Sequence, residues 1–239
     1  MNEKFKRADG RAFDEMRKIE ARTNVIKRAD GSAFFSFGKS KALAAVYGPR
    51  ELFPQHLQNP GKALFRCYYD MLSFSVSERK KPGPGRRNLE ISHEITKAIE
   101  PALLLDTFPN TVIDVYIQIL EADASTRCAA VNAASMALAS AGIPMQELVT
   151  AVSAGKLDTT IVIDLNHEEE QYKIKKDGQE IKAATDIAAA FLTRSKKLSL
   201  LHVDGNLKLE ELKEAFELMK KACVKIEAIQ KQTIKKITD

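Results

Sequence analysis

The stretch VIDVYIQILEADASTRCAAVNAASMALASAGI, residues 112–143, passes directly from a strand pattern to a helix pattern. Apolar and polar side chains alternate in residues 112–120, which is typical of a half-buried strand. Small residues dominate from residue 126 onward, and alanine is the strongest helix former. The sequence therefore predicts that a strand ends and a helix begins close together, around residues 121–126.

Similar segments continue in both directions along the chain. Further strands are predicted at residues 63–76, 159–165 and 197–205, and further helices at 88–105, 144–154 and from 207 onward. Within residues 23–49, Ala29 to Ser32 separate two strand-like runs, which predicts a hairpin turn. A hairpin followed by strands that alternate with helices favours a mixed α/β fold, with helices packed on a largely buried mixed sheet.

We expect one domain over residues 1–239, because no Ser/Gly/Pro-rich linker divides the chain. Residues 1–20 are expected to form an N-terminal arm, and 207–239 a C-terminal helix. RADGRAF (7–13) and RADGSAF (28–34) share six of seven residues, but no third copy follows, so a repeat solenoid is excluded. The C-terminal helix carries one apolar stripe, which fits either packing on the sheet or binding of a partner.

Composition points to an intracellular protein. The 37 Lys and Arg against 32 Asp and Glu give a formal charge of +5, so basic residues matter only where they cluster. Cys67, Cys128 and Cys223 form no C-x-x-C pair, which argues against a disulfide framework or a zinc site. The N-terminus has no apolar signal region, and no segment has the roughly 18 apolar residues of a membrane span. We therefore expect a cytoplasmic location.

A basic loop precedes the helix predicted at 88–105. Five of the nine residues from Arg79 to Arg87 are basic, and residues 82–85 are Pro-Gly-Pro-Gly, which cannot continue a helix or a central strand. Such a charge run is usually a solvated surface. Arg86 and Arg87, however, stand at the predicted helix start, whose free N–H groups favour an anion.

The junction at residues 124–127 is a second candidate anion site. Two hydroxyls, one guanidinium and the backbone N–H groups of a helix start can converge there on a tetrahedral oxyanion; the residues are Ala124, Ser125, Thr126 and Arg127. Ser and Thr are also ordinary helix N-caps, so capping is the alternative interpretation. The stretch is not a P-loop, because G-x-x-x-x-G-K-S/T is absent.

Carboxylates gather in the last third of the chain. Asp164 and the run Glu168 to Glu170 follow the strand predicted at 159–165, and Asp186 comes after a predicted hairpin whose tip is Asp177-Gly178. A run of glutamates on a loop usually faces solvent. A pair of carboxylates brought together across the hairpin can instead hold Mg²⁺ or work as acid and base.

The four histidines give no metal-site signal. His56, His93, His167 and His202 lack a ligand spacing such as H-E-x-x-H, so each is expected on the surface or in the core. His56 lies near basic residues, where it can also contact a phosphate.

Four segments together resemble the RNase PH-type catalytic subunits of archaeal exosomes. They are ADGSAFFSFGKSKALAAVYGPREL (29–52), FSVSERKKPGPGRRNLEIS (74–92), ADASTRCAAVNAASMALASAGIPMQEL (122–148) and GKLDTTIVIDLN (155–166). The likeness runs over nearly the entire chain. Each motif alone is weak, whereas the combination is specific.

The resemblance implies a compact domain of β-α-β-α units and 3′→5′ phosphorolysis of single-stranded RNA, which releases nucleoside diphosphates; the reverse reaction adds 3′ tails. It implies a ring of three copies of this chain and three copies of a related non-catalytic RNase PH-like subunit. Cap subunits with S1 and KH or zinc-ribbon modules are implied on one face. Inorganic phosphate is then a co-substrate, and Mg²⁺ or Mn²⁺ the implied cofactor.

The resemblance also implies roles for individual residues, at the positions where this sequence matches the motifs of the family. Arg86, Arg87 and Arg66 match arginines of the family's RNA path, and residues 124–127 match the site for the attacking phosphate. Asp186 matches one catalytic and metal-linked aspartate, with Glu170 as its partner. An inserted hairpin, at residues 171–186, is implied between the two carboxylates.

The chain departs from the family pattern at three of these positions. Ala124 replaces a common glycine, Tyr68 replaces a second RNA-path arginine and can stack on a base, and Glu170 replaces an aspartate. Asp177 is an alternative to Asp186 as the second carboxylate. Besides a catalytic subunit, two functions stay open: a non-catalytic ring member that binds RNA, and a self-sufficient homohexamer that trims the 3′ ends of transfer RNA.

Overall fold

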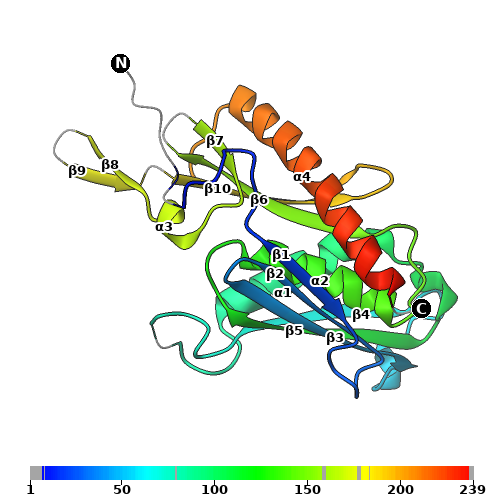
Figure 1. Ribbon diagram of the computed structural model, residues 1–239. Coiled ribbons are helices and arrows are strands. Elements are labelled where there is room, and N and C mark those ends of the chain that lie inside the picture. The colour runs from blue at the N-terminus through cyan, green and yellow to red at the C-terminus, as the bar shows by residue number, and fades with distance from the viewer. Residues whose placement is uncertain are drawn as a thin grey trace.

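The computed structural model describes residues 7, 9–78, 80–157, 160–176, 179–182 and 184–236. The described strands form two sheets and a separate hairpin, and helices lie between the two sheets (Figure 1). One hydrophobic cluster includes buried residues of both sheets and of the helices between them. This is the mixed α/β architecture that the sequence predicts.

The first sheet has strand order β1-β2-β3-β5-β4. Its strands are β1 (Ile19–Thr23), β2 (Gly31–Phe37), β3 (Ser40–Glu51), β4 (Leu64–Met71) and β5 (Thr111–Glu121). Neighbouring strands are antiparallel except β4 and β5, which are parallel because the helix α1 crosses over between them. The side chains of β4 alternate strictly: Phe65, Cys67 and Tyr69 are buried toward the helices, and the residues between them face outward.

The second sheet is antiparallel, with strand order β11-β10-β6-β7. Its strands are β6 (Val149–Leu157), β7 (Thr160–Ile163), β10 (Ala184–Leu192) and β11 (Leu198–Asp204). The separate hairpin consists of β8 (Lys173–Lys176) and β9 (Gln179–Lys182), and it projects from the body of the molecule (Figure 1).

Four α-helices complete the described fold: α1 (Arg86–Ile99), α2 (Thr126–Ser140), α3 (His167–Glu170) and α4 (Leu209–Lys235), with 3₁₀ turns η1 (Gln55–Leu57), η2 (Glu100–Ala102) and η3 (Leu105–Thr107). Helix α2 packs on both sheets and is buried along most of its length. Its small side chains permit this close approach, because a Cβ added at Gly31 of β2 would lie 2.5 Å from the carbonyl oxygen of Ala137.

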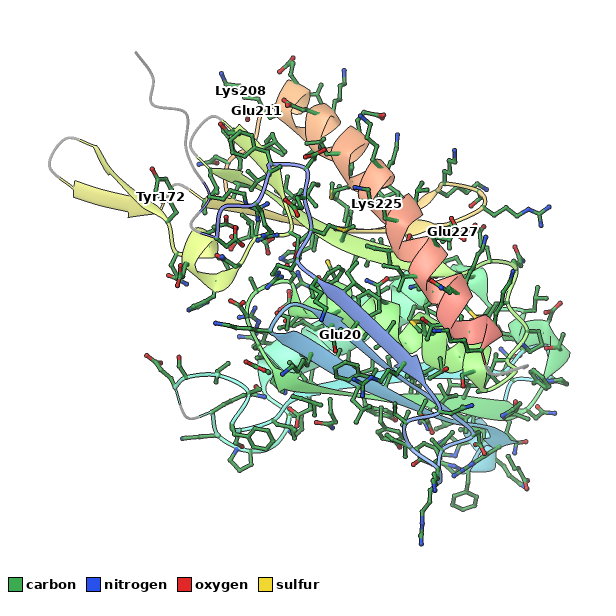
Figure 2. All side chains as sticks on the ribbon, viewed as in Figure 1. Glu20, Tyr172, Lys208, Glu211, Lys225 and Glu227 are labelled. Carbon is green, nitrogen blue, oxygen red and sulfur yellow. The ribbon has the colours of Figure 1, made fainter. Side chains whose placement is uncertain are left out.

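Helix α4 packs its apolar stripe on the second sheet, which confirms the first of the two interpretations offered for it. Met219, Cys223 and Ile226 are buried in the core, whereas Leu209 at the start of the stripe is 62% exposed. Lys225 lies on the exposed face of the helix (Figure 2). At the helix start, the Lys208 backbone N–H donates to the Glu211 carboxylate at 2.9 Å.

Three predicted elements differ from the structure. The helix predicted at 144–154 is wrong, because residues 149–157 form β6. This strand is buried on both faces, so its sequence lacks the alternation of apolar and polar residues that marks a half-buried strand. The predicted turn at 29–32 is misplaced: β1 ends at Thr23, and β2 already begins at Gly31. Helix α1 ends at Ile99 rather than at residue 105, since Pro101 follows.

Among the described helices, none combines the length and the apolar character that crossing a bilayer requires.

Candidate active site

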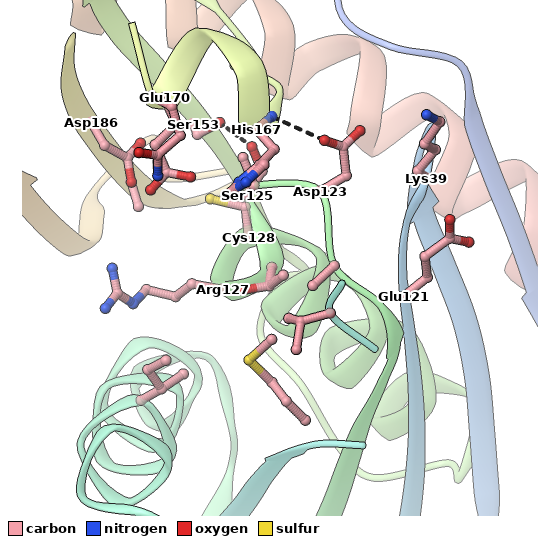
Figure 3. A pocket seen from close by; sticks show the side chains of 18 of the residues that line it. Lys39, Glu121, Asp123, Ser125, Arg127, Cys128, Ser153, His167, Glu170 and Asp186 are labelled. Carbon is pink, nitrogen blue, oxygen red and sulfur yellow. Dashed lines mark hydrogen bonds between the residues drawn. The ribbon is translucent and has the colours of Figure 1, made fainter. Parts of the chain in front are cut away.

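A pocket of about 410 Å³ opens where the start of α2 meets α3, β10 and the start of α1 (Figure 3). Seven of the predicted site residues line it: Arg87, Ala124, Ser125, Thr126, Arg127, Glu170 and Asp186. These residues are up to 99 positions apart in sequence, so the fold brings them together. The remaining predicted residues, Arg66, Tyr68 and Arg86, do not line this pocket.

The start of α2 has the backbone of an anion site. Ala124 and Ser125 both adopt left-handed conformations, with φ of 57° and 55°. Ser125 occupies the N-cap position, but its side chain makes no capping hydrogen bond, so the capping alternative is wrong for this hydroxyl. The hydroxyl instead shares a 2.6 Å hydrogen bond with the Ser153 hydroxyl. The first turn of α2 therefore has no side-chain cap from Ser125, and its first residues line the pocket. The N–H groups of such a helix start are suited to bind an anion.

Thr126 and Arg127 hold this helix start against its neighbours. The Tyr69 side chain points from β4 toward the helices, and its hydroxyl donates to the Thr126 hydroxyl at 3.1 Å. Arg127 extends toward α1, where its Nε lies 2.6 Å from Glu94 Oε2. The other Glu94 oxygen lies 3.2 Å from His202 Nδ1 on β11. Glu94 therefore joins three elements around the pocket: its own helix α1, Arg127 of α2 and His202 of β11.

Asp186 and Glu170 face each other at the upper end of the pocket (Figure 3). Asp186 lies on β10, and Glu170 is the last residue of α3. Burial, together with the charge of Glu170, raises the pKa of Asp186 from 3.8 to about 6, whereas Arg127 and His202 oppose the shift. A carboxyl with such a pKa is half protonated near pH 6 and can act as a general acid.

The other predicted carboxylates have different surroundings. Asp164 is fully buried and bound by Arg17, whose Nη2 lies 2.6 Å from Asp164 Oδ1. Glu169 is also buried, whereas Glu168 faces solvent. Asp177, the alternative second carboxylate, lies outside the described residues.

Two sets of side chains have the chemistry of a cation site. Asp186 and Glu170 supply carboxylate oxygens from two different elements at the same end of the pocket, which suits Mg²⁺ or Mn²⁺ (Figure 3). In the described part of the chain, Glu90, Glu94 and His202 also bring one ligand atom each within 4.8 Å of one another. Glu94 is already paired with the Arg127 guanidinium, so we attribute that second set to the Arg127 contact rather than to a metal.

The paired arginines stand at the helix start that the sequence predicts. Helix α1 begins at Arg86, with Gly85 as its N-cap, and of the two arginines only Arg87 lines the pocket. The preceding loop is attached to the body of the molecule, because Lys80 Nζ lies 3.1 Å from an Asp70 carboxylate oxygen. Arg79, the first basic residue of that loop, lies outside the described residues.

Arg66 and Tyr68 lie on the outer face of the first sheet, on the opposite side of β4 from Tyr69. Arg66 forms a two-pronged ion pair with Asp114 of β5, with N–O distances of 2.7 and 3.0 Å. The Tyr68 ring stacks on Tyr116, with centroids 5.0 Å apart. Strand alternation separates both side chains from the pocket.

The residues that line the pocket without having been predicted as site residues include Lys39, Asp123, Ser153 and His167. The His167 N–H donates to an Asp123 carboxylate oxygen at 2.9 Å, which attaches α3 to the loop before α2 (Figure 3). Lys39 reaches the pocket from the turn between β2 and β3. Lys39 and Asp123 lie inside segments that carry the family resemblance, and Ser153 and His167 lie outside them. None of the four belongs to a chemical motif, so only the fold shows that they line the pocket.

Arg7 of the N-terminal segment binds α3, the short helix that carries Glu170. Arg7 is 2% exposed, and its Nε and Nη2 lie 2.8 and 2.9 Å from the two carboxylate oxygens of Glu169. It also donates to the carbonyl oxygens of Ile163 and Asp164. Since Glu169 immediately precedes Glu170, this buried pair fixes the helix that presents Glu170 to the pocket.

Comparison with known proteins shows which family the chain belongs to. The 3′ exoribonuclease family matches through its domain 1 over residues 15–144 and through its domain 2 over residues 147–222. The chain is 49% identical over 235 residues to the exosome complex component Rrp41 of Thermococcus kodakarensis, which covers 98% of this chain and 90% of that protein. It is 44% identical over 231 residues to Rrp41 of Archaeoglobus fulgidus, covering 95% and 86%.

Solved structures share the fold. The crystal structure of rice Rrp46 matches with a TM-score of 0.81 at 27% identity, over 95% of this chain and 100% of that chain. The Archaeoglobus fulgidus exosome with RNA bound to the active site matches with a TM-score of 0.76 at 20% identity, over 92% and 91%, which shows likeness of fold alone. The chain therefore belongs to the RNase PH-type 3′ exoribonuclease family.

Proposed function

We propose that this chain is the catalytic ring subunit of an RNA-degrading exosome and removes nucleotides from single-stranded RNA by 3′→5′ phosphorolysis. One observation carries the proposal: the uncapped start of α2 with Arg127 and the pair Asp186 and Glu170 share one pocket. Two negatively charged reactants must meet there, and a cationic cradle beside a proton donor serves that need. Kinship with Rrp41 proteins, named as exosome components, supports the same assignment.

In this mechanism Ser125, Thr126, Arg127 and the first N–H groups of α2 hold inorganic phosphate. A phosphate oxygen attacks the phosphorus between the last two nucleotides, and a new P–O bond forms while the bond to the penultimate 3′ oxygen breaks. That oxygen takes a proton, which Asp186 is suited to donate because its pKa lies at about 6. The products are a nucleoside diphosphate and an RNA shortened by one nucleotide.

We propose that Mg²⁺ or Mn²⁺ binds between Asp186 and Glu170. The two carboxylates repel each other, as the raised pKa of Asp186 indicates, and a bound divalent cation would relieve that repulsion. Because the cation would also favour the ionised form of Asp186, proton donation and cation binding are alternative roles of this carboxyl. When bound, the cation would neutralise charge on the transferring phosphoryl group. The longer side chain of glutamate at position 170 is compatible with this donor set.

We propose that RNA enters past Arg87 and Arg86 at the start of α1, with Arg66 and Tyr68 as more distant contacts on the outer sheet face. The partners would be a related non-catalytic RNase PH-like subunit in a ring of three plus three, and cap subunits with S1 and KH or zinc-ribbon modules. A non-catalytic ring member is not favoured, because both acids line the pocket. A stand-alone homohexamer is distinguished by assembly, since it would form its ring without a partner.

The direct test is incubation of the reconstituted ring with single-stranded RNA, Mg²⁺ and inorganic phosphate, followed by analysis of the products. Nucleoside diphosphates that form only when phosphate is present are the expected result. Nucleoside monophosphates formed without phosphate would identify water as the nucleophile, and no products at all would leave a binding role only.

Arg127→Ala is expected to raise the apparent KM for phosphate by about 10- to 100-fold, because a charge-assisted hydrogen bond contributes roughly 1.5–3 kcal/mol. RNA affinity should change little. Initial rates over a range of phosphate concentrations, together with RNA binding by fluorescence anisotropy, measure both quantities. Loss of RNA binding with an unchanged phosphate requirement would mean that the phosphate site lies elsewhere.

The double substitution Arg86→Glu with Arg87→Glu is expected to weaken RNA binding equally across sequences, because interactions with backbone phosphates carry no base information. The slope of log affinity against log salt should flatten by about 0.7 for each RNA phosphate that the protein no longer neutralises on a single strand. Binding titrations at several salt concentrations give the slope. The matched variant Lys97→Glu, at the far end of the same helix, should leave it unchanged.

A further inference from the structure

The contact between Glu94 and Arg127 is not part of the sequence pattern that points to phosphate binding. Glu94 lies on α1, two turns after Arg86, and reaches across to α2. Its Oε2 lies 2.6 Å from Arg127 Nε, and its Oε1 lies 3.2 Å from His202 Nδ1. The Glu94 and Arg127 side chains are 20% and 12% exposed, so solvent weakens this pair much less than it weakens a surface pair.

The atom that Glu94 contacts leaves the rest of the guanidinium available. Arg127 presents five N–H donors in a rigid fork, and a carboxylate at Nε leaves the two terminal nitrogens to bind an oxyanion. Arg127 still lines the pocket, and its charge acts on the nearby Asp186. Glu94 therefore fixes the direction of the side chain while the fork stays accessible.

Glu94 is itself held at both oxygens. His202 belongs to β11 and pairs in register with Ala188 of β10, two residues beyond Asp186. The chain of contacts from β11 through Glu94 to Arg127 thus ties the phosphate-binding guanidinium to the sheet that carries the acid. Without Glu94, the Arg127 side chain would have to lose its rotamer freedom each time phosphate binds.

We propose that Glu94 is a positioning residue that holds the Arg127 guanidinium in the orientation required for phosphate, with His202 as its second anchor. The proposal rests on the proposed phosphorolytic function. Glu94 has two opposite effects on phosphate binding: it orients the Arg127 guanidinium, which favours binding, and its negative charge repels phosphate, which disfavours binding. Preorganisation is expected to dominate, because displacement of a catalytic group by about 1 Å can cost on the order of a hundredfold.

Glu94→Ala is therefore expected to raise the apparent KM for phosphate about tenfold, while kcat at saturating phosphate and the affinity for RNA change less than about twofold. Glu94→Gln keeps the length of the side chain and one acceptor oxygen, so its KM for phosphate should stay close to that of the wild type. Glu90→Gln is the matched control: this exposed carboxylate lies one turn earlier on α1, and its loss should leave the KM unchanged. Unaltered thermal unfolding of each variant confirms that the fold persists.

The decisive comparison adds Glu94→Ala to Arg127→Ala. If Glu94 acts through Arg127, the double variant should have the same phosphate KM as Arg127→Ala alone. A lower phosphate KM in Glu94→Ala would show that Glu94 competes with phosphate. An equal change of KM in Glu90→Gln would show that the effect comes only from negative charge near the pocket. Either outcome overturns the proposal. Failure of the wild-type ring to consume phosphate would instead contradict the proposed function itself.

Discussion

Replacement of Asp186 by asparagine is expected to lower the rate of phosphorolysis by about 10²–10⁴-fold, the usual contribution of a positioned general acid. Asparagine has nearly the same shape but neither donates this proton nor carries the charge that would hold a cation. Asp186 is half-buried on β10 and contributes little to the core, so ring assembly and RNA binding should persist. Release of nucleoside diphosphates under saturating RNA and phosphate measures the effect.

Two further variants define which carboxylates act. Glu170→Gln should be milder, because Glu170 raises the pKa of Asp186 and supports it without being the proton donor. Asp177→Asn is the variant that separates the two alignments of the second carboxylate. An inactive Asp177→Asn protein beside a fully active Asp186→Asn protein would reverse the assignment.

Asp186→Asn is also expected to change the dependence of thermal stability on pH, and this change serves as a control for folding. The pKa of Asp186 is raised in the folded state from 3.8 to about 6, so the fold favours its protonated form. The resulting destabilisation is absent below pH 3.8, grows as the pH rises toward 6, and is complete above it, at no more than about 3 kcal/mol. In metal-free buffer, Asp186→Asn should therefore raise the Tm at about pH 7.5 and leave it nearly unchanged at about pH 4.

Arg7→Ala is expected to lower the free energy of unfolding by about 3–5 kcal/mol, the cost of removing one partner from a buried ion pair. The Glu169 carboxylate would stay buried, with Arg11 Nη2 at 3.8 Å as its remaining cation. The carbonyl oxygen of Ile163 would lose the Arg7 donor as well, whereas that of Asp164 would keep its hydrogen bonds from Arg11. Urea unfolding followed by circular dichroism gives the free-energy change.

The repeated motif supplies the matched control. Arg28 stands in RADGSAF at the position that Arg7 has in RADGRAF, but it is exposed, so Arg28→Ala should change stability by no more than about 0.5 kcal/mol. Equal effects of the two substitutions would show that the buried pair contributes nothing specific. A stable Arg7→Ala protein with reduced activity would place the role of Arg7 in positioning α3 alone.

Local patterns predicted the parts of the site that depend on neighbouring residues. The alternating strand followed by an alanine-rich helix placed the helix start at Thr126, and the Pro-Gly break predicted a helix from residue 88, two residues after α1 begins at Arg86. The approach of Asp186 to Glu170 came from a resemblance, because no local rule joins residues on either side of a hairpin. Strand β6 was missed since a strand covered on both faces has no period of two.

Long-range partners were beyond prediction for the same reason. Glu94 and His202 are 108 residues apart, and the buried partner of Arg7 is 162 residues away. The two RADG copies look equivalent in sequence, yet only the first arginine is buried against carboxylates. Burial, rather than composition, separates them, and burial is a property of the finished fold.

The hairpin of β8 and β9 makes the spacing between the two acids insensitive to the length of chain that separates them. Its strands pair from Lys173 with Lys182, so the chain leaves the body of the molecule and returns to it at one place. When residues are added or removed beyond that pair, only the length of the projecting hairpin changes, and the distance between Glu170 and Asp186 stays the same. In evolution, length could thus drift at this point without selection on catalysis opposing it.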